Sequence, residues 1–313
     1  MIVGRKHVYE KALKIPAGVE GDFEVSHVNF EAGTSLPLAN TRTILLGGDN
    51  GGSVEFKKAT RWHQIAEKGA LWMTDLPIEQ AQHDVALREF RHGSILIGGL
   101  GLGYAVTVVA RRPGVRRVVV IEKAPEVVRL VAAATRRNLG RENAAKVTFV
   151  TADLFDYLRE QSHNTHDTPF ERAFYDIWTS DSETTFHDVV VPLIQQSKFV
   201  VKRQPVCWNE NVMRGQLRHA LMSRWTAPKL GVSDASYEAM SKPYAGSSKS
   251  TAKYWDWAVP FWRWFIQAER SDEEFHAAAD LYAGMYGGWD WERNWEMVIL
   301  LHADHLGPLT LAK

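Results

Sequence analysis

The stretch Ile95-Leu96-Ile97-Gly98-Gly99-Leu100-Gly101-Leu102-Gly103 decides the fold that this sequence predicts. Apolar residues lead directly into alternating glycines, and a helical pattern follows from Tyr104 to Arg112. This order is typical of a buried strand that turns sharply into a helix. Glycine tolerates positive φ angles, and because it lacks a Cβ it lets a ligand approach the main chain. The stretch therefore predicts a ligand-binding strand–turn–helix unit in an α/β domain.

Three further strands are predicted downstream, each with an acidic residue near its carboxyl end. They are Arg117–Ile121 before Glu122, Lys146–Val150 before Asp153, and Ala173–Ile177, which contains Asp176. The carboxyl ends of parallel strands meet at one edge of an open sheet, so we expect these acids in one site. Glu122 can accept hydrogen bonds from a ribose diol, and Asp153 can receive the exocyclic amine of adenine. The pattern indicates a nucleoside-cofactor site in a doubly wound α/β domain.

The region from about Leu71 to Gln204 resembles a class I S-adenosylmethionine-dependent methyltransferase, a likeness that covers less than half of the chain. The positions that match cofactor contacts of that family are Gly99, Gly101, Gly103, Glu122, Asp153 and Leu154, and Asp176 matches its strand-four acid. The resemblance implies a Rossmann-like, mostly parallel sheet and S-adenosylmethionine as the cofactor. It also implies transfer of a methyl group to an acceptor that the sequence does not identify.

The segment before the glycine motif is most similar to the spermidine-synthase-like branch, and it runs from Leu71 through Glu79 to His83. The likeness implies that Asp75 and His83 lie near the substrate. Asp176 is the expected catalytic residue, because a carboxylate there can orient or deprotonate an amine or hydroxyl acceptor. Trp178 is expected to line the acceptor side. Phage and actinobacterial proteins with a Gly-Leu-Gly-Leu-Gly turn and an Asp-Ile-Trp motif look similar over the same span.

Two other functions stay open. The segment Thr74–His83 supports aminopropyl transfer from a decarboxylated cofactor, although only Asp176 and Asp181 supply carboxylates beside the fourth strand. A truncated sheet and a tryptophan-rich tail support a non-catalytic role in a virion or another assembly. A nicotinamide site is disfavoured, because counting Gly-x-Gly-x-x-Gly from Gly101 places Val106 at the last glycine.

Three regions are expected along the chain: a β-rich region (1–70), the cofactor-binding core (71–204) and a helical, tryptophan-rich region (205–313). The first should contain a strand at Phe23–Phe30, a hairpin of Thr41–Leu46 with Ser53–Phe56, and a short helix at Trp62–Lys68. A helix capped by Thr74 or Asp75 should run to about Phe90. A fifth strand is expected at Lys198–Lys202. Two closing strands are either missing or hidden in Val206–Trp208 and Glu296–Leu301.

Composition narrows the functional classes. The chain has 37 Lys and Arg against 37 Asp and Glu, and the resulting zero net charge disfavours a protein dedicated to duplex nucleic acid. Cys207 is the only cysteine, so no intrachain disulfide can form. We expect a cytoplasmic protein, because neither a signal peptide nor a membrane-spanning segment is visible.

Histidines and tryptophans cluster at several places in the sequence. His163, His166 and Asp167 form one short cluster, and His302, Asp304 and His305 form another. Neither has a further partner at a recognised metal-ligand spacing, so we expect no metal. The C-terminal tryptophans recur at helical spacing, as in Trp257 and Trp264. This pattern favours the core of a helical cap, or a subunit interface that would make a homodimer.

Overall fold

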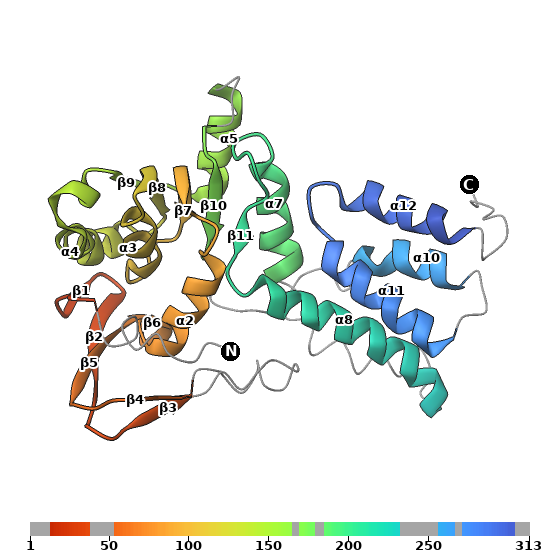
Figure 1. The fold of residues 1–313 in the computed structure, drawn as a ribbon, viewed down its shortest axis with the longest axis horizontal. Helices are drawn as coiled ribbons and strands as arrows, with labels where there is room; N and C mark the ends of the chain where they lie inside the picture. Colours follow the sequence, from red (N-terminus) through yellow and green to blue (C-terminus); the bar gives the residue numbers. More distant parts are fainter. Residues whose placement is uncertain are drawn as a thin grey trace. The chain divides into compact units, whose positions relative to one another are not determined.

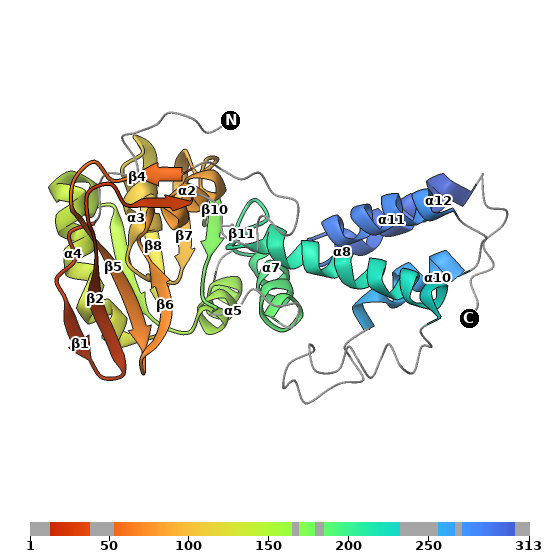
Figure 2. The same ribbon diagram turned by 90° about the horizontal axis from the view of Figure 1, so that it is seen from below.

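The computed structural model describes residues 13–37, 53–164, 169–178, 185–231, 256–266 and 271–303. They belong to two compact units: the first lies within 1–179 and 196–208, and the second within 180–195 and 209–313. Figures 1 and 2 show the elements of each unit. Some of our expectations lie outside the described residues, namely those for Thr41–Leu46, His166, Asp167, Asp181, Asp304 and His305.

A five-stranded sheet with every pairing parallel forms the centre of the first unit, in the order β11-β10-β7-β8-β9. Its strands are β7 (His92–Gly98), β8 (Gly114–Glu122), β9 (Val147–Thr151), β10 (Arg172–Tyr175) and β11 (Val206–Cys207). The order runs outward in both directions from the glycine-bearing strand β7. The predicted Rossmann-like α/β arrangement is confirmed.

Buried apolar runs explain why these strands occupy the middle of the unit. The side chains of Ile95, Leu96 and Ile97 in β7 are fully buried, as are nearly all of those from Val118 to Ile121 in β8. Continuous apolar runs, rather than alternating ones, are typical of parallel strands covered on both faces. Helices α3 (Tyr104–Ala110) and α4 (Pro125–Ala144) pack against each other and against β8.

The fifth strand lies later in the chain than expected. Val201 forms only an isolated bridge with Phe170, and the hydrogen-bonded strand is β11. Helix α7 (Val191–Ser197) ends just before this point, and the carbonyl of Ser197 accepts the N–H groups of both Val200 and Val201. That turn uses two of the N–H groups that a strand at Lys198–Lys202 would need.

The second proposed closing strand is also absent, because Glu296–Leu301 lies inside helix α12 (Trp291–Ala303). The other proposed segment, Val206–Trp208, does supply β11, but it runs parallel to β10. The sheet described here therefore ends at β11.

The N-terminal part of the first unit is an antiparallel sheet in the order β1-β2-β5-β6, beside a two-stranded ribbon. The strands are β1 (Gly18–Glu20), β2 (Phe23–Phe30), β5 (Thr60–Glu67), β6 (Ala70–Thr74), and the ribbon pair β3 (Ser35–Pro37) and β4 (Ser53–Glu55). The helix predicted at Trp62–Lys68 was wrong. Buried Trp62 and Ile65 have helical spacing, but eight residues of β5 pair with β2, and this pairing overrides local spacing.

Helix α2 (Pro77–Ala86) is shorter than predicted and lacks the expected side-chain cap. Leu76 occupies the N-cap position, and neither Thr74 nor Asp75 caps the helix. The Thr74 hydroxyl instead donates to Glu79, and Asp75 accepts hydrogen bonds from β5. Both side chains therefore form hydrogen bonds other than the expected cap.

The second unit is helical in its described part. Four of its helices are α8 (Glu210–Thr226), α10 (Val259–Ile266), α11 (Asp272–Met285) and α12, and α11 contacts the other three (Figure 1). Aromatic rings fill the space between them: Phe261, Tyr282 and Trp295 are buried and touch one another. Trp257 and Trp264 are buried too, which confirms a core role for these tryptophans. Within the described residues, every helix is too short or too polar to cross a membrane.

Candidate functional site

The glycine turn between β7 and α3 carries three positive φ angles, +91° at Gly99, +48° at Gly101 and +78° at Gly103. A Cβ on Gly99 would collide with the main-chain oxygen of Asp176, and one on Gly103 would collide with the Thr135 hydroxyl. These two glycines are therefore required by the packing of the chain itself, in addition to the positive φ angles that the sequence predicts for the turn.

Gly101 is the glycine whose bare face meets a flexible side chain. A Cβ there would collide with the thioether sulfur of Met73, which lies on β6. The N–H of Leu102 also points at this sulfur, with a nitrogen-to-sulfur distance of 3.3 Å. Met73 thus covers the middle of the turn, a contact that no pattern in the sequence predicts.

Glu122 joins the tip of β8 to the glycine turn. One carboxylate oxygen accepts the N–H of Leu100 at 2.9 Å, and the other accepts the N–H of Ala124, at the start of α4, also at 2.9 Å. Burial raises the pKa of this carboxyl, and the backbone hydrogen bonds only partly oppose that effect. Glu122 lies where the sequence predicted it, and it organises the main chain at the strand edge.

Asp153 follows β9 and caps helix α5 (Leu154–Asn164). One oxygen accepts the N–H of Phe155 at 2.9 Å, and the other lies 3.0 Å from the ammonium of Lys123. Burial alone would raise the pKa of Asp153, but the hydrogen bonds from Lys123 and Phe155 outweigh it and lower the pKa. The next residue, Leu154, is buried against Gly98.

Asp176 lies directly after β10, beside the glycine turn. Its N–H donates to the carbonyl of Gly98 at 2.9 Å, so its main chain is held at the carboxyl edge of the sheet. Its carboxylate lies 3.8 Å from the Nε2 atom of His83. The structure thus brings together two residues that are far apart in sequence and that the sequence predicts for one active site.

The ring of His83 has a defined orientation. Its Nδ1 atom lies 2.8 Å from the carbonyl oxygen of Glu79, and because a carbonyl can only accept, Nδ1 carries a proton. The ring also stacks on Trp208, with centroids 3.9 Å apart. Nε2 is left facing Asp176. The sequence does not predict a role for Trp208 in the site, because only the path of β11 brings this residue to His83.

Glu79 is an acidic residue of α2, four positions before His83. Its carboxylate accepts the hydroxyl of Thr74 at 2.8 Å and the Thr74 N–H at 3.1 Å. Burial raises the pKa of Glu79 from 4.5 to about 7, a rise that the Thr74 hydroxyl opposes. A carboxyl group that can gain or lose a proton near neutrality thus lies beside the pair formed by His83 and Asp176.

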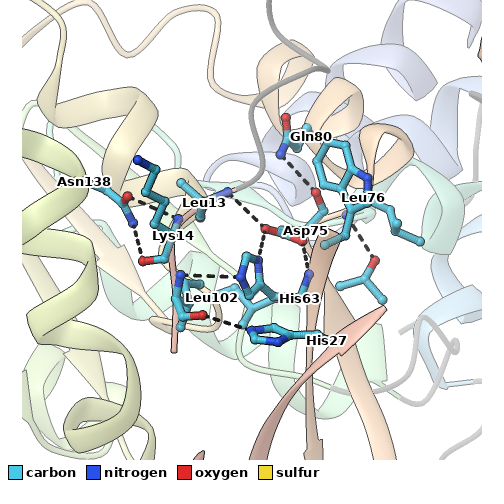
Figure 3. Close-up of polar contacts among 12 residues, drawn as sticks. Leu13, Lys14, His27, His63, Asp75, Leu76, Gln80, Leu102 and Asn138 are labelled. Carbon is cyan, nitrogen blue, oxygen red and sulfur yellow. Dashed lines mark hydrogen bonds and ion pairs between the residues drawn. The ribbon is translucent and has the colours of Figure 1, made fainter. Parts of the chain in front are cut away.

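Asp75 lies in a separate buried network, drawn in Figure 3. One oxygen accepts the N–H of His63 at 2.6 Å, and the other accepts the His63 ring at 2.8 Å and the N–H of Leu13 at 3.3 Å. Nε2 of His63 in turn accepts the N–H of Ile15. A contact between Asp75 and a substrate would have to break these hydrogen bonds.

Trp178 lies two residues after Asp176, and its indole N–H is buried. This group has no hydrogen-bond partner among the residues that the structure describes. A buried donor of this kind can donate to a ligand oxygen or nitrogen. No group of three His, Cys, Asp or Glu side chains in the described ranges could hold a metal ion.

Comparison with known proteins yields distant similarity of structure alone. Neither a protein-family model nor a curated protein sequence matches the chain. One similar solved structure is precorrin-8w decarboxylase from Methanobacterium thermoautotrophicum, with 16% identity and a TM-score of 0.30 over 41% of this chain and 58% of that one.

Two further structures each align with 49% of this chain and 42% of their own, again at 16% identity. One is a candidate SAM-dependent methyltransferase from Streptococcus mutans, with a TM-score of 0.33. The other is a candidate methyltransferase complexed with SAH, with a TM-score of 0.34. In all three comparisons the aligned region spans less than two thirds of the other protein.

Proposed function

We propose that this protein is an S-adenosylmethionine-dependent transferase that moves a methyl group to an acceptor carrying an N–H or O–H group. The observation that carries the proposal is the hydrogen bond from Leu100 in the glycine turn to Glu122 at the tip of the neighbouring strand. It joins the glycine turn to an acid, at the strand edge where open α/β sheets bind ligands.

The residues at this edge fit an adenosyl cofactor under one condition. One carboxylate oxygen of Glu122 accepts the N–H of Leu100, and the other accepts the N–H of Ala124. A carboxylate oxygen has two lone pairs, so both can also accept a ribose hydroxyl. Asp153 keeps acceptor capacity for an amine in the same way. The condition is that Met73 moves away from Gly101, because its side chain lies against the main chain of this glycine.

The acceptor side is formed by Asp176, His83 and Trp178. S-adenosylmethionine, when bound, supplies a methyl group activated by its sulfonium. Asp176 can orient the acceptor and take its proton, and Nε2 of His83 lies 3.8 Å from this carboxylate. The indole N–H of Trp178 can donate to a polar atom of the acceptor. Holding the nucleophile in line with the methyl group then contributes most of the rate.

Calorimetric titration tests the cofactor. S-adenosylmethionine, S-adenosylhomocysteine and decarboxylated S-adenosylmethionine are titrated into the wild-type protein and into Glu122→Gln. We expect the first two to bind, and the variant to bind at least about ten-fold more weakly, because it loses a charged acceptor. Glu142→Gln, an exposed change on α4, is the matched control and should match the wild type.

The outcomes separate the alternatives. Preference for the decarboxylated compound would favour aminopropyl transfer over methyl transfer. Absence of heat with all three compounds in every protein would reject the proposed function and favour a non-catalytic role.

A further inference from the structure

Met73 contacts the site from outside the central sheet. It belongs to β6, an edge strand of the antiparallel sheet. Its side chain lies against Gly101, on the side where any other residue would carry a Cβ. Its sulfur accepts the N–H of Leu102 at 3.3 Å. The Met73 thioether thereby makes two contacts that a ligand bound at this turn would need. One is with the main chain of Gly101 and the other is with the N–H of Leu102.

The path of β6 explains why Met73 reaches the turn. Met73 pairs with Ile65 and Leu71 pairs with Ala66, so Trp72 is an extra residue in the ladder. Bulges of this kind re-aim side chains and are frequent beside functional sites. The bulge directs Met73 away from the regular alternation of the strand and toward the glycine turn.

The same geometry makes Met73 displaceable. An edge strand is hydrogen-bonded on one side only, and β6 pairs with β5 alone in its sheet. Methionine is unbranched and has three rotatable side-chain bonds, and its sulfur is a weak acceptor. By contrast, the groups that crowd Gly99 and Gly103 are a main-chain oxygen and the hydroxyl of Thr135, a β-branched residue on α4. Of the three contacts, the one at Gly101 is the easiest to open.

We propose that Met73 is a built-in occupant of the cofactor site, and that the cofactor must displace it from Gly101 and from the N–H of Leu102 in order to bind. This inference rests on the proposed function and adds its regulation. The resting protein is closed by its own thioether, so the measured affinity is the affinity of the open form reduced by the fraction of molecules that are open. A smaller side chain at residue 73 should therefore tighten binding.

The opposite role for Met73 predicts the opposite sign. A side chain that forms a wall of the occupied site would contribute contact to the bound ligand, and its removal would weaken binding. The direction of the change in affinity thus discriminates between a displaced occupant and a permanent wall.

The experiment measures the affinity for S-adenosylhomocysteine by calorimetry in the wild type, Met73→Ala, Met73→Leu and Leu71→Ala. Loss of a closing contact worth about 1–2 kcal/mol raises the ratio of open to shut molecules roughly five- to thirty-fold, so we expect Met73→Ala to bind more tightly by about that factor. Met73→Leu keeps the bulk and should stay within about two-fold of the wild type. Leu71→Ala removes an exposed side chain from the same strand and should leave the affinity unchanged.

A second measurement follows ligand binding by the wild type in NMR spectra, in case Met73→Ala does not fold, and needs Met73→Leu only for assignment. With methionine labelled at the methyl carbon, the resonance that is missing from Met73→Leu identifies Met73. Saturation with S-adenosylhomocysteine should shift this resonance together with the Leu102 amide, because the contact between them opens.

Unchanged or weaker binding by Met73→Ala would overturn the inference, and so would a Met73 resonance that stays in place while heat shows that the ligand binds. The proposed function fails in a different way, with no binding by the wild type or by any variant.

Discussion

The imidazole of His83 and the indole of Trp208 are stacked, with ring centroids 3.9 Å apart and planes inclined by 25°. Trp208 directly follows β11, and His83 lies on α2. The stack therefore connects α2 to the edge of the central sheet. The partners that flank this stack are Glu79 and Asp176, at the two ring nitrogens of His83.

Removal of the Trp208 ring should destabilise this corner of the first unit. Trp208→Ala loses the stack and exposes His83, and we expect a cost of about 2–4 kcal/mol, near the lower end for a large aromatic truncation because the ring is half-buried. Trp208→Phe keeps a flat ring and should cost about 1 kcal/mol. Urea unfolding followed by circular dichroism measures both. An equal loss of stability in Trp208→Ala and Trp208→Phe would show that the stacked ring does not stabilise this corner of the unit.

Glu79 should make stability depend on pH. Its pKa is raised from 4.5 to about 7 in the folded state, so between these values the folded protein holds a proton that the unfolded chain has lost. Stability should therefore fall as the pH rises from about 4.5 to 7 and stay low above that. Relative to Glu79→Gln, the wild type should lose about 2–3 kcal/mol over this window.

Urea unfolding of both proteins at pH 5, 6 and 8 provides the measurement. Replacement of Glu126, a half-buried acid on α4, by Gln serves as the control and should leave the pH dependence of the wild type intact. A difference between the wild type and Glu79→Gln that is constant with pH would show that Glu79 does not titrate in this range.

The network around Asp75 should fasten residues 13–15 to the sheet (Figure 3). Asp75→Ala leaves the buried His63 ring and the N–H of Leu13 without their acceptor, and we expect a loss of about 3–5 kcal/mol. Hydrogen exchange at the amides of Leu13 and Ile15 should accelerate at the same time.

Asp22→Ala offers a matched comparison for Asp75→Ala. Asp22 forms an exposed ion pair with Lys68, so its removal should cost less than about 1 kcal/mol and leave exchange at Leu13 unchanged. Similar costs for the two aspartates would contradict the assignment of Asp75 to a buried network.

The glycines should differ sharply in their tolerance of alanine. Gly99→Ala places a methyl group against the main-chain oxygen of Asp176, where the backbone must shift, and we expect a loss of more than about 3 kcal/mol. Gly140 has a φ of +74° and a ψ of 168° with no atom within 4 Å of an added Cβ, so Gly140→Ala should cost only about 1–3 kcal/mol of backbone strain. Thermal unfolding of both variants tests this, and equal losses would mean that φ alone decides.

Much of the fold could be predicted because it depends on local patterns. The apolar run into Gly98, the alternating glycines and the spacing to Glu122 predicted β7, α3 and β8, because a buried parallel strand needs a continuous apolar run. Where two patterns competed, local reasoning failed: the segment Trp62–Lys68 has apolar residues at helical spacing, yet strand pairing places it in β5. Lys198–Lys202 has the composition of a strand, yet the turn after α7 uses its donors.

The sequence alone determined which residues stand at the carboxyl ends of the strands, since that follows from strand order and strand length. Only the tertiary structure decided what those residues touch. Met73 on Gly101, Trp208 on His83 and the burial of Glu79 each depend on segments that are distant in sequence or on surrounding packing. The physical reason is that contact and desolvation are properties of assembled surfaces, whereas periodicity and turn chemistry are already present in the unfolded chain.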